Sequence, residues 1–348
     1  MQNNINLIQP DDWHVHLREG DMLKSVTQFT SRINRRCIAM PNTKIPITSF
    51  EKAKEYKETI KKYSSNKNFE PLIPCYLTDD LDLENFRIGL KNNIFIAAKL
   101  YPSNVTTNSK SGVTNLKSIY NALEILEDEN KLLLVHGEKS KKDLDLFDRE
   151  KAFIDDELNN IRNKFPQLKI VLEHVSTEYG VNYIQTNNNI AGTITPHHMM
   201  LTKDDLYINN NINPHHFCMP VVKTEKDLIC LRKAACNNNS KFFLGTDSAP
   251  HHIDQKISKE SLKPGIFSAV SSIELYANIF EEESAINNLE IFSSINGPKF
   301  YNLPVNDTSI TLSKEEWIIP EFIAQNTIKV KNFFGGKKLN WKVQDLKV

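Results

Sequence analysis

The chain has 348 residues, of which 40% are hydrophobic, so it is long enough to bury a substantial core. Its 43 Lys and Arg residues balance its 43 Asp and Glu residues. A net charge of zero argues against nucleic acid or an anionic membrane surface as the partner, and it favours a small-molecule ligand.

The cysteines and the N-terminal sequence indicate the compartment. The five cysteines are odd in number and form no C-x-x-C pair, which disfavours both a disulfide framework and a thiolate zinc site. The first residues lack a basic segment followed by an apolar one, and no apolar run approaches the ~20 residues of a membrane-spanning helix. We therefore expect a soluble, cytoplasmic protein with reduced and mostly buried thiols.

Eight short apolar runs follow one another along the chain, and each precedes polar residues and a longer segment that could be helical. They span residues 11–17, 36–40, 69–77, 94–101, 131–137, 168–175, 189–195 and 241–249. This alternation is typical of repeated βα units. It predicts an α/β fold, a (β/α)8 TIM barrel over residues 1–305, in preference to a doubly wound sheet.

Two helices and a distinct tail complete the prediction. Residues 49–65 should be helical, with Thr48 and Glu51 at the spacing of a capping box. Residues 148–165 should form a second helix. After about residue 300 the rhythm stops, and the tail contains two β-type runs around a Gly-Gly turn within residues 328–343. We expect residues 306–348 to form a short extension that packs on the barrel.

Unusual polar residues fall at or near the C-terminal ends of six of these runs. They are His14 and His16, Asn42, Lys99, His136, His174 and Asp247. In a barrel these ends converge on one face, which is where the catalytic residues of this fold lie. The sequence therefore predicts one shared site.

Imidazoles dominate this set and suggest a metal site. Side chains at i and i+2 of a strand lie on the same face, so His14 and His16 could bind one ion together. H-x-H alone is common by chance, but His136 and His174 each end a run of their own. Four neutral nitrogen ligands suit zinc.

Lys99 and Asp247 need separate explanations. An ammonium would repel a cation, so Lys99 must lose its proton, as a buried lysine near metals can. The neutral amine can add carbon dioxide to give a carbamate, whose two oxygens suit a bridge between two metals. Asp247 could bind a metal and also move a proton as general base and then general acid.

Several motifs together resemble one family. They are HVHLR (14–18), MPN (40–42), AKLYP (98–102), HGE (136–138), EH (173–174) and GTDSAPH (245–251). In this order they resemble the amidohydrolase superfamily, and specifically the homodimeric class II dihydroorotases of pyrimidine biosynthesis. The resemblance runs from about residue 5 to about residue 305, and the combination of motifs is highly specific.

The resemblance implies a binuclear zinc enzyme. His14, His16 and Asp247 would hold one zinc, His136 and His174 the second, and carboxylated Lys99 and a hydroxide would bridge them. The implied reaction is the reversible interconversion of (S)-dihydroorotate and N-carbamoyl-L-aspartate. The hydroxide would attack the ring amide, and Asp247 would pass the proton to the leaving nitrogen.

Substrate contacts are also implied by position. Arg18, Asn42 and His251 match the residues that bind the substrate carboxylate, and Met219 falls where backbone atoms read the pyrimidine edge. Residues 101–115 resemble a mobile lid, in which Thr106 and Thr107 would supply hydroxyl donors. Residues 252–268 depart from the cysteine- and alanine-containing stretch with which the family often helps to bind the carboxylate, and we take Pro264 as the equivalent contact there. His197 and His198 have no ligand counterpart, and we expect them to support the site or the fold.

Two alternatives remain open at this point. The chain could be another binuclear amidohydrolase, such as a hydantoinase, although Arg18 and Asn42 anticipate a substrate carboxylate. It could also be a catalytically silent scaffold of the same fold. Retention of all six candidate ligands argues against the silent scaffold, because loss of ligands is the simplest route to such a state.

Overall fold

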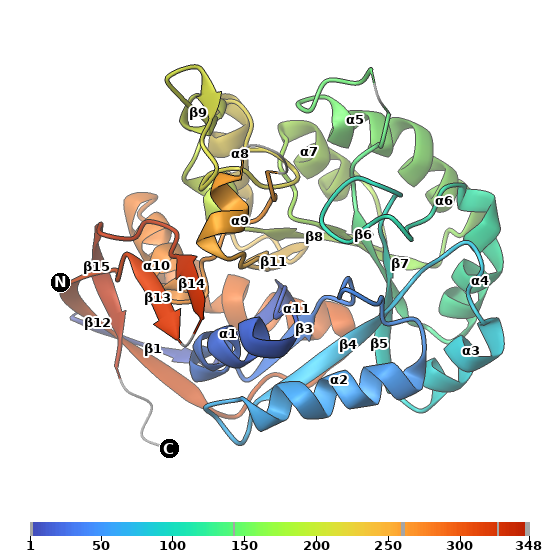
Figure 1. Ribbon diagram of the computed structural model, residues 1–348, viewed down its shortest axis with the longest axis horizontal. Coiled ribbons are helices and arrows are strands. Elements are labelled where there is room, and N and C mark those ends of the chain that lie inside the picture. Colours follow the sequence, from blue (N-terminus) through green and yellow to red (C-terminus); the bar gives the residue numbers. More distant parts are fainter. Residues whose placement is uncertain (1–2, 142, 259–261, 326, 345–348) are drawn as a thin grey trace.

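The computed structural model describes residues 3–141, 143–258, 262–325 and 327–344 (Figure 1). Its centre is a parallel sheet of eight strands in the order β11-β8-β7-β6-β5-β4-β3-β2. The strands are β2 (Asp11–Val15), β3 (Arg36–Ala39), β4 (Glu70–Tyr76), β5 (Phe95–Leu100), β6 (Leu132–His136), β7 (Lys169–Glu173), β8 (Ile190–Ile194) and β11 (Phe242–Leu244). Each of the eight predicted runs contains one of these strands.

The sheet closes into a barrel where its two outermost strands meet. Ser248, just after β11, forms a parallel bridge with Val15 of β2. The His16 amide donates to the Ser248 carbonyl at 3.0 Å, and the Asp247 amide donates to the His14 carbonyl at 2.8 Å. The predicted (β/α)8 barrel is confirmed, and its closure joins the segments that carry His14, His16 and Asp247.

A buried carboxylate reinforces this closure. Asp12 accepts hydrogen bonds from the Thr246 amide at 2.9 Å, the Thr246 hydroxyl at 2.6 Å and the His14 amide at 3.2 Å. Burial raises the pKa of Asp12 to about 6, against the effect of these donors. The donors satisfy a carboxylate that lies out of reach of water.

Helices cover the outside of the barrel, and those from α2 to α7 form an arc around the strands in Figure 1. They are α1 (Gly20–Ile33), α2 (Phe50–Lys62), α3 (Leu83–Lys91), α4 (Tyr120–Asp128), α5 (Arg149–Phe153), α6 (Asn159–Lys164), α7 (Glu178–Thr186), α8 (Glu225–Cys236) and α10 (Ser272–Glu282). A π turn over Ile154–Leu158 joins α5 to α6, so the predicted helix over 148–165 is a single irregular one.

The start of α2 corrects one prediction. The N-cap is Ser49, whose hydroxyl accepts from the Lys52 amide at 3.4 Å, and the predicted capping box of Thr48 and Glu51 is wrong by one residue at its start. Serine and threonine both serve as N-caps, so residue type separates two adjacent candidates only weakly. Packing of the buried face of α2 decides the register.

Alternation along the strands separates the barrel interior from the layer under the helices. In β6, Leu132 and Leu134 face inward, whereas Leu133 and Val135 pack with the helices. The interior cluster consists of Trp13, Ile38, Met40, Ala97, Leu132, Leu134, Val171, Ala191, Phe243 and Tyr301. The inward row of each strand continues to the C-terminal mouth of the barrel, where polar residues replace apolar ones.

The chain after the barrel forms two small antiparallel sheets. β12 (Ser309–Ile318) pairs with β15 (Lys338–Val343) and with β1 (Asn4–Ile8), while β13 (Phe322–Gln325) pairs with β14 (Ile328–Lys331). The two β-type runs of the tail are therefore strands, but they belong to different sheets and do not pair with each other. Because the first strand of the chain joins this sheet, both ends of the chain fold together. The domain boundary at residue 305 stays a prediction.

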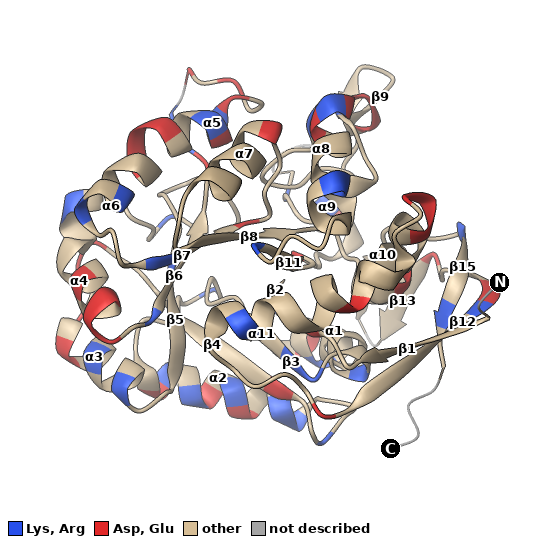
Figure 2. Cartoon of the chain, turned by 180° about the vertical axis from the view of Figure 1, so that it is seen from behind, with Lys and Arg blue, Asp and Glu red and all other residues tan. Residues whose placement is uncertain are grey.

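The outer surface mixes charges of both signs. Lys and Arg alternate with Asp and Glu over the helices, in keeping with the net charge of zero (Figure 2). Within the described ranges, no helix is both long and apolar enough to cross a bilayer. All five cysteines are free, and Cys37, Cys75, Cys218 and Cys236 are buried, as expected.

Gly297 in α11 (Asn296–Tyr301) offers a test of the packing beneath β2. A Cβ there would lie 2.0 Å from Nε1 of Trp13, whose ring is buried and stacks on Tyr301 with centroids 4.3 Å apart. We expect Gly297→Ala to lower the free energy of unfolding by about 1–3 kcal/mol, because this ring has no room to move. Lys299→Ala, exposed on the same helix, should change it by less than about 0.5 kcal/mol. Urea unfolding measures both, and equal values for the two variants would contradict the packing.

Candidate active site

Polar side chains end the inward rows at one mouth of the barrel. His136 ends the row of β6, Lys99 lies near the end of β5 and Glu173 ends β7, and all three are buried. Asp247 lies three residues beyond β11, in the chain segment that closes the barrel. The predicted strand-end residues are thus brought together in one place.

Three of the predicted site residues adopt a left-handed backbone. Arg18 has φ of 60°, His174 of 41° and Asp247 of 45°. For residues other than glycine this conformation is uncommon, and it clusters at functional sites where the surrounding structure enforces it. At His174, the first residue after β7, the positive φ turns the imidazole back toward the mouth of the barrel.

Two imidazoles and one carboxylate, from opposite ends of the chain, meet at a single point. Nε2 of His14 lies 3.3 Å from Nε2 of His16. Oδ1 of Asp247 lies 3.3 Å from the first nitrogen and 3.1 Å from the second. Ligands bound tetrahedrally to zinc at about 2.0 Å are separated by about 3.3 Å, so this triangle has the size of one face of such a site.

Neighbouring groups favour the tautomers that leave the converging nitrogens without protons. Oδ1 of Asn42 lies 2.9 Å from Nδ1 of His16, and it must accept because Nδ2 of Asn42 donates to the Thr107 carbonyl. Oε1 of Glu173 lies 3.1 Å from Nδ1 of His14. Nδ1 of His16 therefore carries the hydrogen, and its Nε2 presents a lone pair. The Glu173 carboxylate favours the same tautomer of His14 by its proximity, although the two atoms do not form a hydrogen bond. Burial lowers the pKa of His16 to about 3, which keeps the ring neutral.

His136 and His174 form a second imidazole pair beside the first. Their ring centroids are 4.6 Å apart, and the His174 ring lies 5.0 Å from that of His14. Nε2 of His136 lies 2.8 Å from Oε2 of Glu138, so the carboxylate fixes the ring and leaves Nδ1 free. Burial lowers the pKa of both imidazoles. Possible ligand atoms of His14, Glu173 and His174 also lie within 4.8 Å of one another, whereas His136 belongs to no such close group among the described residues.

Lys99 completes the cluster and is wholly buried. Its Nζ contacts Oε2 of Glu173 and lies 4.6 Å from the centroid of the Tyr101 ring. Burial lowers the pKa of Lys99 well below its ordinary value, and Asp247 opposes this effect. An amine with a lowered pKa has access to the neutral form that carbamate formation requires.

Four of the predicted substrate residues, Arg18, Asn42, Met219 and Pro264, line a pocket above this cluster, whereas His251 is not part of its lining. It is lined by His16, Arg18, Asn42, Tyr101, Thr106, Thr107, His136, His174, Met219, Asp247, Ala249, Pro264 and Gly265. The predicted lid closes over it. The Thr107 hydroxyl donates to the Pro264 carbonyl at 3.4 Å, and Nδ2 of Asn108 donates to the Asn42 carbonyl at 3.0 Å.

Arg18 lies in one wall of this pocket. Its Nε donates to the Pro250 carbonyl at 3.1 Å, and its Nη2 lies 3.0 Å from Nε2 of His251. Nη1 meets no acceptor in the part of the chain that the structure describes. A buried guanidinium with a free donor fits an anionic ligand, and its planar fork matches a carboxylate. Nε2 of His251 also lies 2.9 Å from the carbonyl oxygen of Pro264, which can only accept a hydrogen bond.

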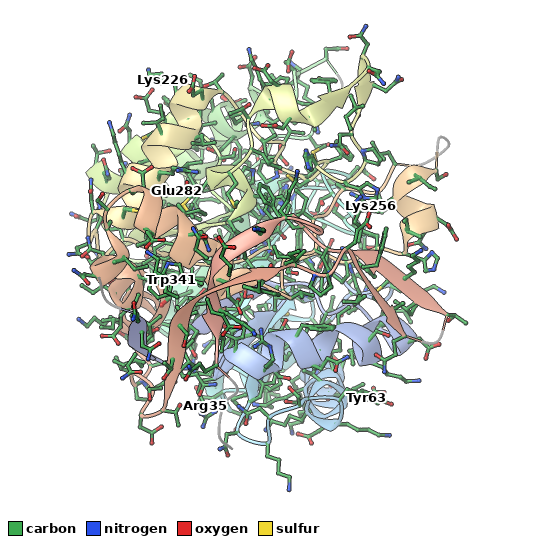
Figure 3. The ribbon with its side chains drawn as sticks, turned by 90° about the vertical axis from the view of Figure 1, so that its left-hand side faces the viewer. Arg35, Tyr63, Lys226, Lys256, Glu282 and Trp341 are labelled. Atoms are coloured by element: carbon green, nitrogen blue, oxygen red, sulfur yellow. The ribbon has the colours of Figure 1, made fainter. Side chains whose placement is uncertain are left out.

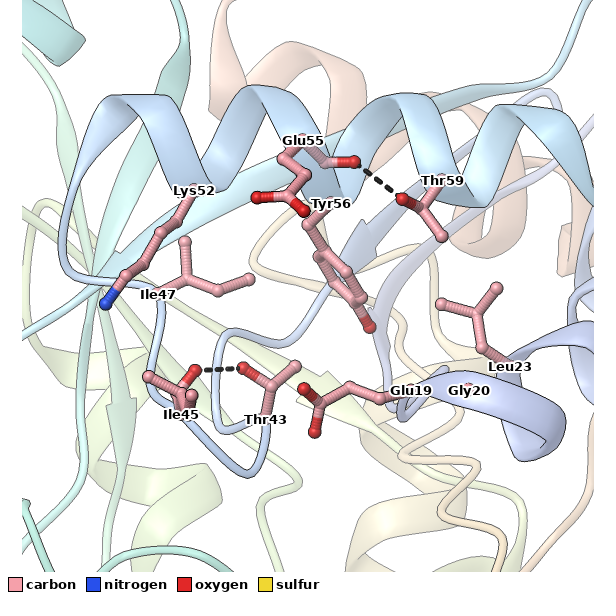
Figure 4. A pocket seen from close by; sticks show the side chains of 10 residues that line it. All are labelled: Glu19, Gly20, Leu23, Thr43, Ile45, Ile47, Lys52, Glu55, Tyr56 and Thr59. Atoms are coloured by element: carbon pink, nitrogen blue, oxygen red, sulfur yellow. Dashed lines mark hydrogen bonds between the residues drawn. The ribbon is translucent and has the colours of Figure 1, made fainter.

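The turn that carries Arg18 is braced from outside the barrel. The Tyr56 hydroxyl of α2 donates to the Arg18 carbonyl at 2.9 Å, and Glu19 accepts from the Lys44 amide at 2.5 Å. Glu19 and Tyr56 line a surface pocket of about 750 Å³ empty volume between α1 and α2 (Figure 4). The Tyr56 hydroxyl and the Glu19 carboxylate already bond to backbone groups of the chain. This surface pocket therefore lies on the outer side of the turn that carries Arg18.

Some residues of the site have no role assigned from the sequence. Glu138 bonds to the ring of His136 and Glu173 lies beside that of His14, and each stands within two positions of a predicted ligand. An acidic residue that close to a candidate histidine is the signal that could have identified them. Both ring nitrogens of His198 have hydrogen-bond partners: Nδ1 lies 2.8 Å from the Thr195 hydroxyl, and Nε2 lies 3.0 Å from the Pro220 carbonyl.

Comparisons with known proteins identify the family of this chain. The model of the amidohydrolase family matches residues 7–319. A dihydroorotase of Aliivibrio fischeri is 43% identical over 341 residues, which cover 98% of this chain and 99% of that protein. The dihydroorotase of Saccharomyces cerevisiae, solved in complex with 5-fluoroorotic acid, superposes with a TM-score of 0.92 at 33% identity over 99% of both chains.

A hydantoinase is a more distant neighbour. The L-hydantoinase of Arthrobacter aurescens superposes with a TM-score of 0.79 over 97% of this chain and 82% of that chain, but its identity of 14% shows a shared fold alone. The full-length similarity is to the dihydroorotases, in sequence and in structure. The chain belongs to the amidohydrolase family and, within it, to the dihydroorotases.

Proposed function

We propose that this chain catalyses the reversible interconversion of (S)-dihydroorotate and N-carbamoyl-L-aspartate, a step of de novo pyrimidine (UMP) biosynthesis. The observation that carries the proposal is the triangle of His14, His16 and Asp247 at the base of a pocket that also contains Arg18. Cyclic amide hydrolysis needs an activated water beside a group that moves protons. An anionic substrate also needs a cation in the wall of the pocket.

The family is metal dependent, and the clustered donors of this chain fit metal ions. We propose that His14, His16 and Asp247 hold one zinc, that His136 and His174 hold a second, and that Lys99 bridges them as N6-carboxylysine. Bound zinc would polarise the amide oxygen and lower the pKa of a water molecule. The buried, neutral imidazoles are supported as ligands by Glu173, Asn42 and Glu138, which lie beside or bond to their outer nitrogens.

Asp247 is suited to move the proton. Burial would raise its pKa, but a cation held between the imidazoles of His14 and His16, whose Nε2 atoms lie 3.3 and 3.1 Å from Oδ1 of Asp247, would keep the carboxylate ionised. The ionised carboxylate can take a proton from the attacking water. It can return that proton to the ring nitrogen when the C–N bond of the cyclic amide breaks.

The remaining pocket residues would bind and enclose the substrate. Arg18, Asn42 and His251, together with the segment at Pro264, would contact the carboxylate, while backbone atoms of Met219 would face the ring. Thr106 and Thr107 of the closed lid would add hydroxyl donors and exclude bulk water. A hydantoinase substrate without a carboxylate would leave the fork of Arg18 unused, and a silent scaffold would have no need of the six ligands.

The proposed function also bears on the partner, the assembly and the location of the protein. The substrate of a dihydroorotase is a small molecule. The homodimer and the cytoplasmic location stay predictions, which rest on the family resemblance and on the composition.

Metal content is the first test. We expect about two zinc ions per chain by elemental analysis of protein purified without chelator, because the ligand set is that of a two-metal site. Dialysis against a chelator should abolish turnover, and added zinc should restore it. Full turnover by protein shown to be free of metal would contradict the proposal.

Asp247→Asn tests the proton-transfer role. The amide keeps the shape of the carboxylate but cannot accept a proton, so turnover should fall by about 10²- to 10⁴-fold. Loss of dihydroorotate ring absorbance measures the rate, and circular dichroism checks the fold. Asp128→Asn, exposed at the end of α4, is the matched control and should retain wild-type turnover. A near-normal rate for Asp247→Asn would refute the role.

Arg18→Lys tests carboxylate recognition. Lysine keeps the charge but loses the planar fork, so we expect KM to rise by about tenfold or more while kcat changes less. Arg87→Lys, on the exposed face of α3, is the control. Steady-state kinetics with dihydroorotate and with N-carbamoyl-L-aspartate should both show a larger change in KM than in kcat. An unchanged KM would exclude Arg18 from substrate binding.

A further inference from the structure

Lys256 is a buried lysine that the proposed reaction does not use. It lies on the short helix α9 (Ile253–Ile257), at 5% exposure (Figure 3). Its Nζ donates to the carbonyls of Phe217 at 3.1 Å, Lys263 at 2.9 Å and Gly265 at 2.8 Å. An ammonium has three N–H donors, so each of them has a backbone acceptor. Burial lowers the pKa of Lys256 to about 7, and these carbonyls offset part of the cost of burying its charge.

The three carbonyls belong to two loops that face the substrate pocket. The first, residues 217–220, carries Met219, and the second, residues 263–265, carries Pro264. Neither loop belongs to a strand of the barrel, so no ladder of hydrogen bonds fixes its position. The Gly265 amide donates directly to the Phe217 carbonyl at 2.9 Å, and Lys256 adds a second link to the same oxygen.

The second loop also meets the other parts of the site. The Pro264 carbonyl lies 2.9 Å from Nε2 of His251 and accepts from the Thr107 hydroxyl of the lid. At Gly265, a Cβ would lie 2.6 Å from the Ala249 carbonyl, so this backbone packs directly on the segment after Asp247. A shift of the loop would therefore displace the wall of the substrate pocket and the contact that closes the lid.

We propose that Lys256 is a positioning residue, which holds the two loops at the spacing that the substrate ring requires. The inference rests on the proposed function and adds a determinant of substrate affinity to it. Lys256 contacts none of the proposed metal ligands, which lie on or just beyond β2, β5, β6, β7 and β11. Its loss should weaken binding of the substrate and of the product more than it slows the bond-breaking step.

The chain contains a matched control for this arrangement. Nζ of Lys241 also donates to three backbone carbonyls, those of Ile184 at 2.8 Å, Gln185 at 3.1 Å and Asn187 at 2.6 Å. Lys241 immediately precedes β11 and so lies at the opposite end of that strand from Asp247. Lys241→Met removes the same number of bonds without touching the pocket.

The experiment compares kcat and KM of the zinc-loaded wild type, Lys256→Met, Lys256→Arg and Lys241→Met. For Lys256→Met we expect KM to rise about tenfold or more with kcat within about twofold. Lys256→Arg should raise KM by about threefold, because a planar fork cannot direct three hydrogens at the same carbonyls. Lys241→Met should leave KM unchanged. Equal KM values for Lys256→Met, Lys241→Met and wild type would overturn the inference.

Hydrogen exchange separates failure of this inference from failure of the proposed function. The Gly265 amide should lose protection in Lys256→Met and keep it in Lys241→Met. A zinc-loaded wild type that does not hydrolyse dihydroorotate would overturn the proposed function and, with it, this positioning role. If Lys256→Met does not fold, Lys256→Arg decides, and a wild-type KM in that variant would contradict the role.

Discussion

The site depends on a concentration of lone pairs that only a cation can stabilise. Nε2 of His14 and Nε2 of His16 face each other at 3.3 Å, and the Asp247 carboxylate faces both. All three groups are buried at the mouth of the barrel. Closure of the sheet holds them there, because the hydrogen bonds that join β2 to the segment after β11 begin at these same residues. The barrel thus supplies in advance the charge pattern that a divalent ion requires.

Support for this arrangement comes from a layer of polar groups behind it. Asn42 and Glu138 each bond to one nitrogen of His16 and of His136 and leave the other nitrogen free, while Glu173 lies beside Nδ1 of His14. Farther out, the loops that carry Met219 and Pro264 lack the support of the sheet. Lys256 supplies it through three hydrogen bonds to the backbone. The sheet therefore holds the proposed metal ligands, and Lys256 holds the loops where the substrate ring would bind.

Much of this could be predicted from the sequence because it depends on short-range patterns. The strands follow from apolar runs, and His136 and Asp247 stand out because they are polar residues at the ends of such runs. Strands β1 (Asn4–Ile8) and β15 both pair with β12, which neither of them adjoins in the sequence, and no local pattern identifies such partners. The start of α2 was misplaced because Thr48 and Ser49 can both serve as caps. The role of Lys256 is visible only once two loops are brought together around it.

The account is tested most directly by a crystal structure of zinc-loaded protein, with anomalous scattering recorded at the zinc edge. We expect two peaks, one bound by His14, His16 and Asp247 and one by His136 and His174. Density should extend beyond Nζ of Lys99 as a carbamate that reaches both ions. Absence of any peak between the Nε2 atoms of His14 and His16 in catalytically active crystals would contradict the central claim that this triangle is built around a metal.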